Sequence, residues 1–217
     1  PRRAVERGLV LTPHLGASTE EAQENVAIDV AEQIRDVLLG LPARSAVNIP
    51  GLSAEIMERL KPHLQLAETV GLLVSQLAGG PGKERELRLQ GEFASHPSQP
   101  LVIAALKGLL SAGLGDSINF VNASLEAKAR GIQVLEVKDE SSRDFAGGSL
   151  QITTRGDQGN RSVTGAVFAD GDLRITSIDA FPVNVTPSSH MLFTRHRDMP
   201  GIIGHLGSLL GEHNVNI

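Results

Sequence analysis

The 217-residue chain lacks cysteine, tryptophan and tyrosine, and it contains only six phenylalanines. The lack of cysteine excludes disulfides, thiolate nucleophiles and cysteine-ligated zinc centres. With few aromatic side chains and a formal net charge of −5, the chain has neither the stacking platforms nor the basic surface typical of nucleic-acid binding. No apolar run approaches the roughly 18 residues of a membrane-spanning helix, and no signal-type apolar core follows the basic N-terminus. We therefore expect a cytoplasmic protein with no nucleic-acid or membrane partner.

The most informative segment lies near the N-terminus. Residues 9–11 form a short apolar run, typical of a buried strand, which leads into Pro13 and His14. Gly16 follows, and then a helix start with capping residues. Open α/β sheets bind ligands at such strand-to-helix turns, so His14 is a candidate proton donor or acceptor. The alternative interpretation is a histidine that only closes the turn.

This segment resembles the end of the nucleotide-binding domain of the D-3-phosphoglycerate dehydrogenases. These enzymes are a branch of the D-2-hydroxyacid dehydrogenase family and catalyse the first step of L-serine biosynthesis. The matching string is Thr12-Pro13-His14-Leu15-Gly16-Ala17-Ser18-Thr19. The resemblance implies that His14 is the catalytic acid/base, and that His14, Leu15, Gly16 and Ala17 lie against the nicotinamide end of NAD. It also implies NAD-dependent oxidation of 3-phospho-D-glycerate to 3-phosphohydroxypyruvate.

A long amphipathic helix is predicted from Ser18 to about Gly40. Ser18 with Glu21 matches a capping box. Apolar residues then recur at intervals of three or four and form one stripe: Val26, Val30, Ile34, Val37 and Leu38. A domain boundary is expected near residues 45–52.

The middle of the chain reads as helices followed by strands, which indicates an α+β domain. The pattern predicts a helix over 53–79, broken or kinked at Pro62, and a strand over 84–94 on which Leu87 and Leu89 face inward and Arg85 faces mostly outward. A helix beginning at Pro100 and a short helix over 122–131, capped by Asn122, are expected next. Strands are predicted at 132–137, 149–154, 162–169 and 173–178, with a tight hairpin at 170–172.

The same region resembles the intervening (allosteric substrate-binding) domain of the longer D-3-phosphoglycerate dehydrogenases. The likeness rests on Phe120-Val121-Asn122-Ala123 and on the later strand-hairpin-strand pattern. Some members of that family bind phosphate or substrate in this domain, and Arg174 stands at a matching basic position. Phe181 and Pro182 replace the basic pair that the family has beside it, so the chain departs from the family pattern at this phosphate or substrate site.

The last segment predicts a strand over 191–194 and a helix from Pro200 to Glu212, with Asp198 as a cap, before a strand that begins at Asn214. It resembles the opening of an ACT domain, a ferredoxin-like β-α-β-β-α-β regulatory module. The expected architecture is therefore α/β to α+β. It consists of the end of a Rossmann-like NAD-binding domain over 1–48, the intervening domain over 52–186 and a truncated ACT domain over 190–217.

In the family, ACT domains pair edge to edge and trap L-serine. By position, this implies that His196, Asp198 and Asn216 are the effector contacts. A carboxylate or amide suits the ammonium group of an amino acid, and a helix N-terminus suits its carboxylate. The alternative is that Asp198 only caps a helix and Asn216 only occupies a turn. The ACT edge and the long N-terminal helix both favour self-association, as a dimer or a tetramer.

Four histidines crowd the C-terminal segment: His190, His196, His205 and His213. His205 and His213 are two helical turns apart, and no close carboxylate pair completes a ligand set, so no metal site is expected.

The chain has no initiator methionine and no G-x-G-x-x-G after a strand. The family's catalytic Glu and Arg and its nucleotide loop are expected before residue 1, so the chain alone should be inactive. A stand-alone amino-acid-binding and oligomerisation module without catalysis is the alternative function. A dehydrogenase for a different 2-hydroxy acid is a third possibility.

Overall fold

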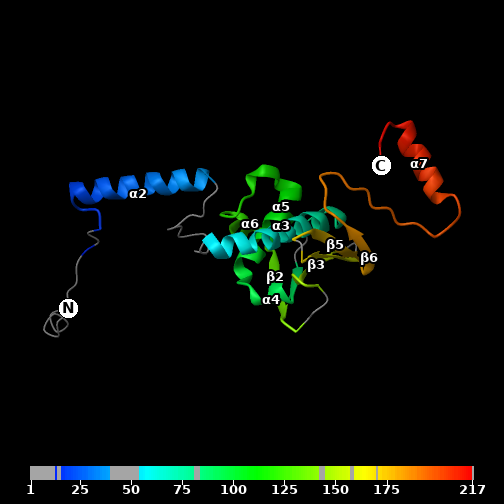
Figure 1. Cartoon of the computed structure of the whole chain (residues 1–217), viewed down its shortest axis with the longest axis horizontal. Helices are drawn as coiled ribbons and strands as arrows, with labels where there is room; N and C mark the ends of the chain where they lie inside the picture. The colour runs from blue at the N-terminus through cyan, green and yellow to red at the C-terminus, as the bar shows by residue number, and fades with distance from the viewer. Residues whose placement is uncertain are drawn as a thin grey trace. The chain divides into compact units, whose positions relative to one another are not determined.

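The computed structural model describes residues 13, 16–39, 54–80, 84–141, 145–156, 159–169 and 171–216. The chain divides into two compact units, Pro1–Thr186 and Pro187–Ile217. The first unit holds a mixed six-stranded sheet with helices, so the predicted α+β class of the middle region is confirmed (Figure 1). No helix in these described ranges is both long and apolar enough to cross a membrane.

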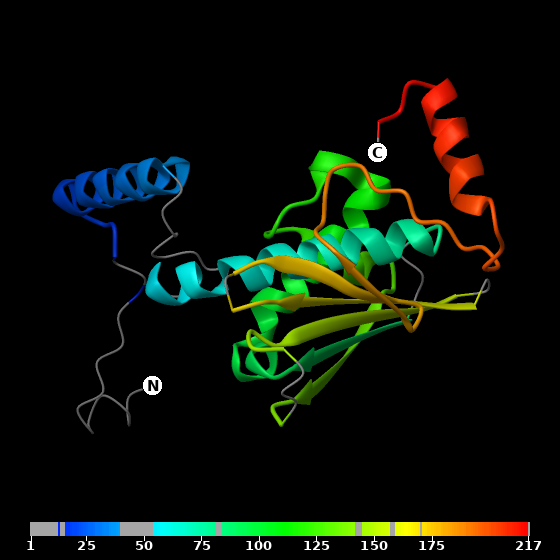
Figure 2. The same cartoon turned by 45° about the vertical axis from the view of Figure 1, so that its right-hand side comes forward.

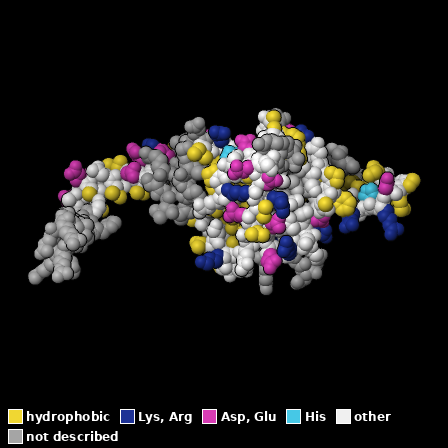
Figure 3. Space-filling model, turned by 90° about the horizontal axis from the view of Figure 1, so that it is seen from below, with side chains coloured by type: hydrophobic (Ala, Val, Ile, Leu, Met, Phe, Trp, Pro, Cys, Tyr) yellow, Lys and Arg dark blue, Asp and Glu magenta, His cyan; other side chains and the backbone are white. Residues whose placement is uncertain are grey.

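The predicted N-terminal helix is α2, Glu20–Leu38. Thr19, not Ser18, is its N-cap, and the Thr19 Oγ1 accepts a hydrogen bond from the Ala22 amide at 3.2 Å. The apolar stripe is present but exposed; Val30, for example, is 47% exposed and Ile34 is 56% exposed. Figure 3 shows hydrophobic side chains along this helix. Within the described residues, α2 therefore buries none of its stripe.

Two helices form the centre of the first unit. They are α3, Ala54–Leu77, which runs through Pro62 without a break, and α5, Ser98–Leu114. Their backbones nearly touch: a Cβ on Gly71 would lie 2.3 Å from the Ala105 carbonyl oxygen, and one on Gly108 would lie 1.9 Å from the Glu68 carbonyl oxygen. The ion pair between Lys107 and Glu68 at 2.6 Å joins the same two helices.

The sheet has the order β2-β1-β3-β4-β5-β6. Its strands are β1, Glu84–Gln90; β2, Gln133–Asp139; β3, Ser149–Gly156; β4, Gly159–Val167; β5, Leu173–Ile178; and β6, Phe181–Val185. β1 and β2 are parallel, and the chain between them forms α4, Glu92–Ser95; α5; the 3₁₀ turn η1, Gly115–Ser117; and α6, Ala123–Ala129. The remaining pairs are antiparallel.

The core lies between this sheet and α3, which packs against β3 and β4 (Figure 2). Leu87 and Leu89 of β1 pair with Ile152 and Leu150 of β3, and all four side chains are buried. Gly165 of β4 lies directly under α3, because a Cβ there would approach Leu66 to 2.8 Å. The prediction that Leu87 and Leu89 of β1 face inward is therefore confirmed.

Strand β6 was not predicted from the sequence. A two-residue turn at Asp179 and Ala180, with φ of 47° and 66°, connects it to β5. Such left-handed turns normally use Asn-Gly or Asp-Gly, so Asp-Ala gave no hairpin signal. The Asp179 carboxylate stabilises the turn by accepting hydrogen bonds from the Ser162 amide at 3.0 Å and from Arg161.

The predicted cap of α6 has the right position but different chemistry. Asn122 is the N-cap residue, yet its side chain does not bond to the helix. Instead its Oδ1 accepts from the Asn119 amide at 2.8 Å and its Nδ2 donates to the Ser117 carbonyl at 2.8 Å.

In the second unit, the predicted helix is α7, Ile202–Glu212. The predicted strand at 191–194 is wrong, because these residues have no regular structure. A strand needs a neighbour to pair its backbone groups, and no described residue of this unit provides one. The predicted cap is also wrong: Gly201, with φ of 92°, is the N-cap, and no side chain bonds to the helix start. Pro200 lies in the turn before α7.

Candidate functional site

The N-terminal site residues are described only in part. His14 and Leu15 lie outside the described residues. Gly16 and Ala17 form an exposed turn before α2, where the Ala17 carbonyl accepts from the Gln23 side chain at 3.3 Å. Their roles at the cofactor stay predictions, and an exposed glycine-containing turn leaves backbone open to a bound molecule.

The predicted effector residues belong to the second unit and are all exposed. His196 and Asp198 precede α7, and the His196 Nδ1 lies 3.0 Å from the Arg197 carbonyl oxygen. Asn216 follows α7 in irregular chain. The strand that would set a pairing edge beside them is not formed here, so their effector role also stays a prediction.

Arg174, the basic position singled out in the sequence, is already engaged. Its guanidinium donates to Asn184 Oδ1 and to Asp172 Oδ2, each at 3.1 Å, and lies over the Phe168 ring, 5.0 Å from the ring centroid. Only its Nε is buried without a hydrogen-bond partner. The side chain therefore joins the start of β5 to Asn184 of β6.

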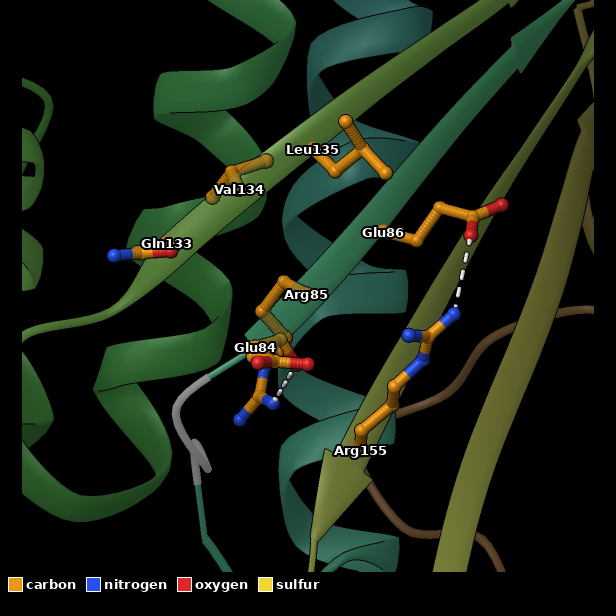
Figure 4. A pocket seen from close by; sticks show the side chains of 7 residues that line it. All are labelled: Glu84, Arg85, Glu86, Gln133, Val134, Leu135 and Arg155. Atoms are coloured by element: carbon orange, nitrogen blue, oxygen red, sulfur yellow. Dashed lines mark hydrogen bonds and ion pairs between the residues drawn. The ribbon is translucent and has the colours of Figure 1, made fainter.

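A hollow of about 280 Å³ lies at the start of β1, beside β2 and β3 (Figure 4). We call it the Arg85 hollow, and its lining residues are Glu84, Arg85, Glu86, Gln133, Val134, Leu135 and Arg155. The register explains the cluster, because Glu84 pairs with Gln133 on one side and with Arg155 on the other. Figure 4 shows the Arg155 guanidinium directed toward Glu86, 3.9 Å from its carboxylate.

Arg85 was predicted to face mostly outward, which is wrong. It is only 3% exposed, and it pairs with Thr154, which is also buried. Strict alternation puts residues 85, 87 and 89 on one face, so the register that buries Leu87 and Leu89 also buries this charge. The parity of the strand was the signal that could have identified it.

The Arg85 guanidinium is poorly compensated. Nη1 donates to the Glu84 carbonyl at 2.7 Å, whereas Nε and Nη2 are buried and have no partner among the described residues. Glu86 is engaged by Arg88 at 2.8 Å and by Arg155. Burial lowers the pKa of Arg85 to about 10. A hollow lined by such a charge can attract a small oxyanion, a carboxylate or phosphate group.

Replacing Arg85 with methionine should raise the free energy of unfolding at pH 7. A pKa lowered to about 10 means that the folded state holds the charge at a penalty at every pH below 10. That penalty fades as the pH rises from 10 toward the unfolded value. At about 1.4 kcal/mol per pKa unit, the gain is about 1–3 kcal/mol, measured by urea unfolding.

Arg88→Met is the matched control for this change on the same strand. Arg88 is 41% exposed and its pair with Glu86 lies at the surface, so its loss should change stability by less than about 0.5 kcal/mol. A lower urea midpoint for Arg85→Met than for the unmodified chain would show that the guanidinium supports the fold. Added phosphate that stabilises the unmodified chain but not Arg85→Met would identify the hollow as an anion site.

Acidic and basic side chains also alternate over the central part of the face seen in Figure 3. Such mixing produces no broad field of one sign.

Comparison with known proteins gives a consistent family. A family model described as the D-3-phosphoglycerate dehydrogenase intervening domain matches residues 59–179. The chain is similar to the D-3-phosphoglycerate dehydrogenase of Synechocystis sp., at 63% identity over 210 residues, covering 96% of this chain and 38% of that protein. It is also similar to the D-3-phosphoglycerate dehydrogenase of Bacillus subtilis, at 35% identity over 216 residues, covering 99% of this chain and 41% of that protein. The enzyme of the same name from Archaeoglobus fulgidus is 36% identical over 209 residues, covering 96% of this chain and 39% of that protein. The chain spans about two fifths of the length of these curated relatives.

Proposed function

The chain belongs to the D-3-phosphoglycerate dehydrogenase intervening-domain family, and from this premise we propose that it is part of an NAD-dependent dehydrogenase. The full-length protein oxidises 3-phospho-D-glycerate to 3-phosphohydroxypyruvate in L-serine biosynthesis. The observation that carries the proposal is the 63% identity, over 96% of this chain, to a protein named D-3-phosphoglycerate dehydrogenase. Identity at that level extends well beyond the intervening domain, and a shared fold alone would not require it.

His14 has the central role in this proposal. As general base it removes the proton of the substrate hydroxyl, and in the reverse direction it returns that proton as general acid. NAD, when bound, supplies the hydride-accepting nicotinamide. The turn at Gly16 and Ala17 supports a cofactor contact, because both residues are exposed and neither has a large side chain.

Self-association is a further part of the proposal. The stripe on α2 has side chains from Val26, 49% exposed, to Leu38, 82% exposed. Five large apolar residues on one face of a helix favour burial against another surface. A homodimer or homotetramer would provide that surface.

The test is NADH formation by the full-length protein with 3-phosphoglycerate, measured with and without L-serine. We expect turnover with 3-phosphoglycerate and much less with 2-hydroxy acids that lack the phosphate. Inhibition by L-serine that is lost in Asn216→Ala would support the effector role of the second unit. No NADH formation, together with direct L-serine binding, would instead favour the stand-alone regulatory module. Turnover only with another 2-hydroxy acid would contradict the proposed substrate.

A further inference from the structure

Three metal-ligand side chains meet where α3 passes α4. His63 comes from α3, Glu92 begins α4, and His96 directly follows it. One ligand atom from each lies within 4.8 Å of the other two. His63 is buried, at 4% exposure, the His96 side chain is 13% exposed, and the Glu92 side chain is 40% exposed. The group is therefore closed on its histidine side and open to solvent at the carboxylate.

His63 is oriented by the loop before β3. Its Nε2 lies 3.2 Å from the Gly147 carbonyl oxygen. Because a carbonyl only accepts, Nε2 is the donor in this contact, and in the neutral tautomer the lone pair lies on Nδ1. That Nδ1 is buried and has no hydrogen-bond partner in the described part of the chain. A histidine that donates one ring N–H to a backbone carbonyl and leaves the other nitrogen unprotonated has the arrangement found at metal ligands.

The surrounding packing fixes this orientation. The His63 ring lies edge-on to Phe93, with centroids 4.5 Å apart, and edge-on to His96, with centroids 4.8 Å apart. Gly147 is held by its own amide, which donates to the Val167 carbonyl at 3.1 Å. A Cβ on Gly147 would lie 2.6 Å from that carbonyl oxygen, so no residue with a side chain fits at this position of the loop.

His96 supplies a second unused nitrogen. Its Nε2 is buried, has no hydrogen bond to any described residue and lies 3.7 Å from Glu92 Oε1, beyond hydrogen-bond distance. Burial lowers the pKa of His96. The neighbouring His63 and Arg59 lower this pKa further, whereas Glu92 raises it. One ring nitrogen of His96 and one of His63 belong to the three ligand atoms that lie within 4.8 Å of one another.

Buried polar atoms without partners are rare in folded proteins, and two of them beside a carboxylate require an explanation. We propose that His63 Nδ1, Glu92 and His96 Nε2 bind one divalent transition-metal ion of the Zn²⁺ class, with water as the fourth ligand. Two imidazoles and one carboxylate form a typical three-residue zinc set. Mg²⁺ and Ca²⁺ prefer oxygen ligands alone, so they are disfavoured.

The required adjustment is small. Ligand atoms around four-coordinate zinc are roughly 3.3 Å apart, given bonds of about 2.0 Å. The present separations therefore contract by about 1.5 Å at most. Glu92 can make this movement, because its side chain is the most exposed of the three. The ion would tie α4, a four-residue helix without a side-chain cap, to the central helix α3.

Zinc titration of the 217-residue chain tests this proposal, with the protein free of any histidine tag and first treated with a chelator. In competition with a chromophoric chelator, one Zn²⁺ should bind per chain, and His96→Gln and Glu92→Gln should each weaken it at least about 100-fold. His205→Gln and His213→Gln are matched controls, since both residues lie on or next to exposed α7. They should leave the tight site unchanged. Zn²⁺ should also raise the melting temperature by several degrees, whereas Mg²⁺ should not.

Co²⁺ gives a readout that does not depend on stability. The unmodified chain should show the intense visible bands of four-coordinate Co²⁺, and His96→Gln, checked for folding by circular dichroism, should lose them. Unchanged Zn²⁺ affinity in both His96→Gln and Glu92→Gln would overturn the proposal. So would loss of the tight site in the His205 or His213 variant, because the ion would then bind in the second unit. Neither measurement depends on dehydrogenase activity.

Discussion

Replacing His14 with alanine in the full-length protein should lower kcat for NADH formation by about 10³-fold. A positioned general base contributes typically 10²–10⁴-fold, and alanine can neither accept nor return the hydroxyl proton. The affinity for NADH, measured by fluorescence, should change little, because the backbone of this segment is retained. The steady-state rate with saturating 3-phosphoglycerate is the measurement.

His14→Gln separates proton transfer from hydrogen bonding. Glutamine can still bond to the substrate hydroxyl but cannot take up its proton, so its rate should resemble that of His14→Ala. The limb of the pH–rate profile that reports proton loss from His14 in the free enzyme should disappear in both variants. His190→Ala, at an exposed position, is the control and should keep full activity. A His14→Ala enzyme with the original rate and pH profile would leave this residue only a role in closing the turn.

Local periodicity predicted most of the first unit. The 3.6-residue spacing identified α3 and α5, and the alternation around Leu87 and Leu89 identified β1. These patterns reflect burial against a single core, which is why they can be read without knowing the partners. Arg85 was missed because its charge was given more weight than its parity along the strand.

The metal-ligand cluster could not be predicted from a local pattern. Glu92 and His96 are four residues apart, a weak helical signal, but His63 is on another helix. Only the packing of α3 against the start of α4 brings them together, and sequence spacing does not encode that. The strand predicted at 191–194 is wrong although its local pattern is suitable. Its apolar residues suit a sheet, but no described strand of the second unit pairs with them.

Gly108→Ala should destabilise the 217-residue chain by about 3 kcal/mol or more. Alanine in a helix interior normally gains about 1 kcal/mol over glycine. Here the added Cβ would lie 1.9 Å from the Glu68 carbonyl oxygen and 2.9 Å from the Leu72 amide nitrogen, both backbone atoms that no rotamer change can move. The helices α3 and α5 would have to separate, which opens gaps in a core where Leu109 is 2% exposed and Val70 is fully buried.

Gly113→Ala is the matched control on the same helix. Outside its own helix backbone and chain neighbours, no atom of the described residues lies within 4 Å of its added Cβ, and its φ is not positive, so the substitution should stabilise the chain by about 0.5–1 kcal/mol. Urea unfolding of the two variants should therefore shift in opposite directions, although each adds the same methyl group. If both shifted toward stability, α3 and α5 would not be in backbone contact in solution. The buried positions of α5, and the path of the chain between β1 and its parallel partner β2, would then need a different arrangement. A loss confined to Gly108→Ala would instead locate the central constraint of the first unit at the helix crossing.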